Sequence, residues 1–134
     1  MKSIVLMLIL GAVVSGCGTV SSPDGSRSIS TFGGFISQNR QNIARLEYGM
    51  TKAQVHETMG MASIRDYANP YSSNLYRRDN GDVVEVLSYW TDGSYQDGIS
   101  DDDLTPVVLV NNSVIGWGRT FFGDYVQKME IKIR

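Results

Sequence analysis

The chain has 134 residues, of which 42% are apolar and 19% are charged, and its formal net charge is −2. This length is sufficient for one small domain with a thin core and too short for two. Because there is no excess of basic residues, binding to the phosphate backbone of nucleic acids is disfavoured. The 14 glycines and 10% aromatic residues indicate a folded, partly β protein rather than a disordered chain.

The N-terminus has the features of a bacterial secretory signal. Lys2 precedes an apolar run, Ile4–Val14, which is too short to cross a bilayer as a helix, since a span needs about 20 residues. The run continues into Val14-Ser15-Gly16-Cys17, in which an apolar residue and two small residues precede a cysteine, the pattern of a lipoprotein signal. We therefore expect residues 1–16 to be removed as a signal peptide and Cys17 to be acylated.

An ordinary signal peptide followed by an incidental cysteine is the alternative. Cys17 is the only cysteine, so it cannot form a disulfide within the chain, and acyl chains on it would attach the protein stably to a bilayer. Gly18 occupies the position where, by resemblance to the sorting signals of enteric-type bacteria, Asp retains lipoproteins at the inner membrane. We expect an outer-membrane lipoprotein whose domain faces the periplasm, with surface exposure as the other possible orientation.

The rest of the chain divides into a tether and a domain. We expect residues 17–34 to contain the acylated cysteine and a flexible tether rich in Gly and Ser, and residues 35–134 to form the folded domain. The first predicted helix spans Phe35–Tyr48, with Ser37 as its N-cap and Gly49 as its stop signal.

The next helix has the strongest local signals in the chain. Thr51 and Gln54 have the spacing of a capping box, and Met50 and Val55 have that of a hydrophobic staple. Gly60 suits the position after the helix, where a positive φ is favourable. These signals predict a short helix from Lys52 to Met59, which must pack on a sheet because it is too short to be stable alone.

The remaining segments read as strands and turns. Strands are predicted to begin at Leu75 and to span Val83–Thr91, Thr105–Val110, Ser113–Gly118 and Tyr125–Ile133, with tight turns at 79–82 and 111–112. The last strand is predicted from its alternating apolar and charged residues. The predicted fold is α+β, with two N-terminal helices packed on one face of a three- to five-stranded antiparallel sheet.

The segment Tyr48–Val55, Tyr-Gly-Met-Thr-Lys-Ala-Gln-Val, together with Gly60 and the lipoprotein signal, resembles the BamE (SmpA/OmlA) group of small outer-membrane lipoproteins. The resemblance implies an α-α-β-β-β fold of the kind found in β-lactamase inhibitor proteins. It also implies a role as an accessory subunit in the assembly of the envelope or of outer-membrane proteins. Thr105–Gly118 is similar to a sister family of envelope lipoproteins with the same fold.

The chain offers little for catalysis or metal binding. His56 is the only histidine, no nucleophile lies near it in the sequence, and no His or Cys stands at a metal-ligand spacing from it. There is also no Gly-x-Ser-x-Gly motif. We expect no enzyme activity, no catalytic residue, no cofactor and no metal.

A cluster of acidic residues raises calcium binding as an alternative. The cluster consists of Asp92, Asp97, Asp101, Asp102 and Asp103. It does not follow the order of an EF-hand loop, because Asp97 stands where glycine is required. A solvated loop that faces a partner is the preferred interpretation, and calcium binding stays open.

Aromatic and arginine side chains, the residue types enriched in interface hot spots, supply the candidate contact residues. The candidates are Arg77, Tyr95, Trp117, Phe121 and Phe122. The function expected from the sequence is a non-catalytic scaffold that binds another envelope protein. An inhibitor-like or ligand-binding periplasmic module is the alternative.

Overall fold

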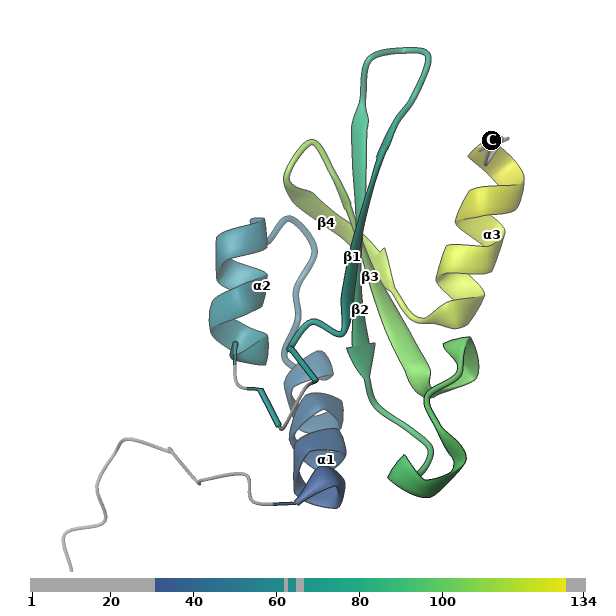
Figure 1. Ribbon diagram of the computed structural model, residues 1–134. Coiled ribbons are helices and arrows are strands. Elements are labelled where there is room, and N and C mark those ends of the chain that lie inside the picture. The colour runs from purple at the N-terminus through teal and green to yellow at the C-terminus, as the bar shows by residue number, and fades with distance from the viewer. Residues whose placement is uncertain (1–30, 62, 65–66, 130–134) are drawn as a thin grey trace, which may run out of the picture.

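An antiparallel sheet with helices on both faces forms the centre of the fold (Figure 1). The computed structural model describes residues 31–61, 63–64 and 67–129. The elements are α1 (Phe32–Ile43), α2 (Lys52–Met59), β1 (Ser72–Arg77), β2 (Val83–Trp90), the short 3-10 helices η1 (Tyr95–Asp97) and η2 (Asp101–Asp103), β3 (Leu104–Val110), β4 (Ser113–Trp117) and α3 (Arg119–Met129). The α+β class and the antiparallel sheet are as predicted. Within these residues no helix has the length and apolar character that crossing a membrane requires.

The four strands follow each other in the order β1-β2-β3-β4. The predicted turn between β3 and β4 is confirmed, because Asn111 and Asn112 adopt φ values of 49° and 66°. The pairing of β3 with β4 is irregular at Val108 and Leu109, where β4 contains a bulge.

Each face of the sheet has its own apolar cluster. On the face of α2, Val55 and Met59 pack with Leu87, Val107 and Leu109. At the end of the sheet near α1, the buried side chains are those of Phe35, Ile36, Ile64, Trp90 and Leu104. On the opposite face, the α3 residue Tyr125 packs with Val84 and Val108. Figure 1 shows α1 and α2 on one side of the sheet and α3 on the other.

The bounds and the capping of α2 agree with the prediction. Thr51 Oγ1 accepts a hydrogen bond from the Gln54 amide at 3.3 Å, and Gln54 Oε1 accepts one from the Thr51 amide at 2.9 Å. Gly60 ends the helix with a φ of 75°. The capping residues and Gly60 predict the bounds of this helix correctly because each of them acts within a few residues of the helix.

The bounds predicted for the first helix are wrong at both ends. The helix begins at Phe32, inside the range predicted for the tether, and its N-cap is Thr31 rather than Ser37, since Thr31 Oγ1 accepts from the Gly34 amide at 3.1 Å. It ends at Ile43, after which a turn brings Leu46 into the core. Gly49 therefore does not stop a helix. Residues 17–30 of the predicted tether lie outside the described residues.

The strand predicted at Tyr125–Ile133 is also wrong, because residues 119–129 form α3. Residues 130–133 of that prediction lie outside the described residues. Phe121 and Tyr125 are four residues apart, so they are neighbours on the surface of a helix, and their rings stack with centroids 6.1 Å apart. The helices consequently cover both faces of the sheet rather than one.

Candidate functional site

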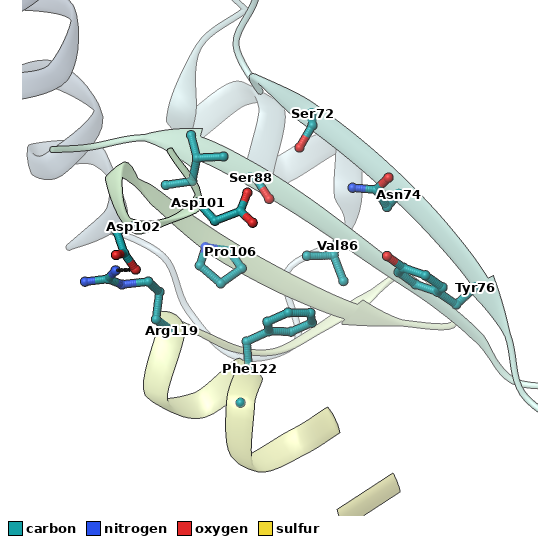
Figure 2. A pocket seen from close by; sticks show the side chains of 12 residues that line it. Ser72, Asn74, Tyr76, Val86, Ser88, Asp101, Asp102, Pro106, Arg119 and Phe122 are labelled. Atoms are coloured by element: carbon teal, nitrogen blue, oxygen red, sulfur yellow. Dashed lines mark hydrogen bonds and ion pairs between the residues drawn. The ribbon is translucent and has the colours of Figure 1, made fainter. Parts of the chain in front are cut away.

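A pocket of about 340 Å³ lies between the sheet and the N-terminal turn of α3 (Figure 2). Val86 and Pro106 line its floor, Phe122 points into it from α3, and Tyr76 closes one end. The full lining comprises Ser72, Asn74, Tyr76, Val86, Ser88, Asp101, Asp102, Leu104, Pro106, Arg119, Phe122 and Gly123.

The pocket lies where short side chains occupy one row of the sheet and leave space beneath the start of α3. Ser72 pairs with Ser88, and Ser88 pairs in turn with Pro106, so this row has little volume above the backbone. Helix α3 packs against β3 and β4, whereas β1 contributes Ser72, Asn74 and Tyr76 to the wall of the pocket.

The rim of the pocket carries charge. Arg119 at the start of α3 forms an ion pair with Asp102 of η2, which ties the loop between β2 and β3 to the helix. Asp101 lines the same end of the pocket (Figure 2). An apolar wall with hydroxyl, amide and carboxylate groups around it suits an amphipathic molecule or a side chain of a partner protein.

Carboxylates of the acidic loop form hydrogen bonds and ion pairs with other groups of the protein. Asp92 pairs with Arg40 at 2.7 Å, and Asp97 accepts from Ser94 Oγ at 2.7 Å. Asp103 accepts from the amide and the hydroxyl of Ser100, and these hydrogen bonds lower the pKa of its carboxyl. In the part of the chain that the structure describes, no three His, Cys, Asp or Glu side chains come together in a way that could hold a metal ion.

The candidate contact residues do not share one surface. Trp117 packs against the α2-face cluster and its ring lies 5.3 Å from that of Tyr48, measured between centroids. Phe121 is half-buried over β4 on the opposite face, and Phe122 lines the pocket.

The other candidates lie elsewhere. Arg77 is exposed at the end of β1. The backbone of Tyr95 belongs to η1, and its side chain lies outside what the structure describes, as does Cys17. Among the candidates whose side chains the structure describes, only Phe122 contributes to the pocket.

His56 lies near a polar cluster between α2 and the sheet. Lys52 Nζ contacts Glu85 Oε1 at 2.5 Å, and Ser73 Oγ donates to the same oxygen at 2.9 Å. The His56 Nδ1 atom is buried without a hydrogen-bond partner. Burial, and then the charge of Lys52, lower the pKa of His56, while Glu85 acts in the opposite direction.

We expect the lowered pKa of His56 to make stability depend on pH. The unfolded chain binds a proton near the ordinary pKa of 6.5, whereas the folded protein binds it only at lower pH. The free energy of unfolding should therefore fall as the pH falls through 6.5, and level off below the pKa of the folded state. Urea unfolding between pH 5 and pH 8 measures this slope.

His56→Gln is the matched control for this experiment. The variant should lose the slope in that pH range, because the pKa values of Asp82 and Asp103 are lowered from 3.8 and these groups titrate in more acidic solution. An equal slope in the wild type and the variant would contradict the assignment to His56.

A buried amide network joins elements that are distant in the sequence. Asn39 Nδ2 donates to the Trp90 carbonyl at 2.8 Å and to Asn69 Oδ1 at 3.1 Å, and Asn69 Nδ2 donates to Asn39 Oδ1 at 2.9 Å. Asn69 and Asn42 also donate to the carbonyl of Met59. The network fixes α1, the end of α2 and the end of β2 together. The network was not predicted, and its only local signal was the presence of Asn39 and Asn42 inside a predicted helix.

The comparisons with known proteins give one family. No curated protein and no solved structure matches the chain. Residues 20–124 match the family described as "Protein of unknown function (DUF3192)", and this match covers most of the chain, including all of the elements from α1 to β4. The chain therefore belongs to the DUF3192 family.

Proposed function

We propose that this protein is a non-catalytic outer-membrane lipoprotein that serves as a periplasmic scaffold or accessory subunit in envelope assembly. The observation that carries the proposal is the apolar run Ile4–Val14 followed by Ser15-Gly16-Cys17. Acyl chains on Cys17 would hold the domain at the membrane, and Gly18 favours the outer membrane as its destination.

The extent of the family match supports this division of the chain. The match begins at residue 20, shortly after Cys17, and the first helix begins at Phe32. The residues that the family shares therefore start beyond the proposed anchor. About a dozen residues of family sequence would then remain as a spacer between the lipid and the domain.

The order of elements supports a BamE-like domain. Helices α1 and α2 precede an antiparallel meander, and the capped α2 contains the motif that resembles the BamE group. Our finer proposal is that α1 and α2 correspond to the two helices of that fold and that α3 is added on the other face. Since one fold carries many functions, the order of elements supports the class of protein more than the identity of its partner.

Intact-mass analysis of protein purified from membranes tests the anchor. We expect a chain that begins at Cys17 and carries the added mass of acyl groups. Cys17→Ser should abolish that mass and the association of the processed chain with the membrane, because the thiol that forms the thioether is missing. Ser15→Ala is the matched control, since it keeps a small residue before the cleavage site and should be processed normally.

A wild-type chain trimmed after Gly16 without added hydrocarbon mass would refute the anchor.

The scaffold role has a separate test. A photo-reactive residue in place of Phe122, at the pocket, should cross-link an envelope protein in living cells. One in place of Glu57, on the exposed side of α2, provides the comparison.

The pocket favours a second candidate function, a periplasmic module that binds a small amphipathic ligand. Its volume of about 340 Å³ and its mixed lining of Phe122, Val86 and Asp101 fit such a molecule. Extraction of the purified protein followed by mass spectrometry would identify a retained ligand. Phe122→Ala should reduce the amount retained.

A further inference from the structure

The two edges of the sheet differ in how they are protected. The edge at β4 is covered by the chain between α1 and α2, because the Gly49 amide donates to the Val114 carbonyl at 2.8 Å and the Val114 amide donates to the Met50 carbonyl at 2.9 Å. No strand of the described residues pairs with the outer edge of β1. Strand β1, Ser72–Arg77, has neither a proline nor a bulge within it, two of the features that protect a free edge.

The exposed face of β1 carries an apolar side chain. Leu75 is 65% exposed and pairs with Glu85 of β2, on the face of the sheet where Lys52 of α2 contacts Glu85. Ser73 and Arg77 lie on the same face, since side chains alternate along a strand. Ser72, Asn74 and Tyr76 face the pocket instead (Figure 2).

From this edge we infer that the protein forms a two-fold symmetric dimer in which β1 pairs antiparallel with β1 of a second copy, centred on Leu75. In a continuous sheet, residues opposite each other must point to the same face, so Leu75 faces the Leu75 of the partner subunit. Their Cβ atoms would then lie about 4.5–5.5 Å apart. The contact covers the exposed leucine on both copies at once.

Charge complementarity supports this register. Centring on Leu75 places Arg77 opposite the partner's Ser73. Within one copy, Glu85 Oε1 accepts from Ser73 Oγ at 2.9 Å and contacts Lys52 Nζ at 2.5 Å, so the carboxylate of Glu85 lies beside Ser73. The guanidinium of Arg77, which makes no hydrogen bond or ion pair with the described residues of its own copy, would therefore meet the partner's Glu85.

Alternative registers lose these contacts. Centring on Asn74 would place Leu75 opposite the partner's Ser73 and leave no pair of leucines at the axis. Centring between two residues would put side chains of opposite faces against each other, which the alternation of a sheet excludes. The register centred on Leu75 is the one that brings the two leucines together and also places Arg77 near the partner's Glu85.

Disulfide trapping in the full-length protein tests the geometry. Leu75→Cys should give a dimer on a non-reducing gel after mild oxidation, because the two sulfur atoms would meet across the axis. Tyr48→Cys is the control for chance collisions, since Tyr48 is 74% exposed and lies away from β1. Equal yields from the two variants, or no dimer from Leu75→Cys, would overturn the proposal.

The molar mass in solution provides the second measurement. Sedimentation of the purified protein over a concentration series should show a monomer–dimer equilibrium. Arg77→Glu should weaken the dimer at least tenfold, whereas Arg45→Glu, which makes the same change in charge at an exposed position after α1, should leave the equilibrium unchanged. A wild-type protein that stays monomeric, or equal weakening by both variants, would refute the proposed interface.

Discussion

Asn39→Asp should destabilise the protein by about 3–5 kcal/mol, the cost of leaving a buried charge without compensation. The substitution keeps the shape of the side chain and replaces Nδ2 by an oxygen. This nitrogen donates to the Trp90 carbonyl and to Asn69 Oδ1, so the new oxygen would face two acceptors. Asn39 is 1% exposed, and water cannot solvate the carboxylate. Urea unfolding followed by far-UV circular dichroism measures the loss.

Gln41→Glu is the matched control, because it introduces the same charge into α1 at an exposed position. Its effect should stay within about 0.5 kcal/mol, as for most surface substitutions. If the two variants unfolded at the same urea concentration, the buried amide network would not contribute to stability as we argue.

Gly116→Ala should destabilise the protein by about 1–3 kcal/mol through overpacking. Gly116 lies in β4 beneath the ring of Phe121, and a Cβ at this position would lie 2.6 Å from Phe121 Cε2. A real Cβ cannot approach a ring carbon so closely, so the ring of Phe121 must shift from its packed position against β4. Thermal unfolding of the variant measures the cost.

Two further variants separate this contact from a general effect of losing glycine. Gly123→Ala changes a glycine within α3 that has no atom within 4 Å of its added Cβ, so it should stabilise the helix by about 0.5–1 kcal/mol. Phe121→Leu combined with Gly116→Ala should cost less than the sum of the two single changes, because the smaller side chain leaves room for the new methyl group. Additive effects would contradict the proposed clash.

The parts of the fold that were predicted well depend on short-range signals. The capping residues Thr51 and Gln54 fix the start of α2 through hydrogen bonds within four residues, and the turn at Asn111 depends on its own backbone preference.

Residues 125–129 of the strand predicted at Tyr125–Ile133 belong to α3, and their apolar residues fit the period of a helix as well as that of a strand. Tyr125 and Met129 are four residues apart, a spacing that satisfies a helix as well as an alternating strand. The stacking of Phe121 on Tyr125 and the packing of Tyr125 on Val84 and Val108 of the sheet select the helix. Tertiary packing of this kind is not visible in a local pattern.

The candidate site was less predictable than the fold. The pocket depends on three short residues, Ser72, Ser88 and Pro106, that come together only through the register of three strands. The amide network joins Asn39 to Asn69 across thirty positions of sequence. Neither the three pocket residues nor the two asparagines form a sequence motif. Phe122 could be selected by residue type alone, because aromatic side chains often line binding surfaces.

The coverage of β4 by Gly49 and Met50 also sets a limit on assembly. A sheet with two open sides can add subunits without end and grow into a fibre. Here one side is capped by the protein's own backbone, so a second copy that joins through β1 presents only another capped side to the solvent. Growth by strand addition would therefore stop at the dimer.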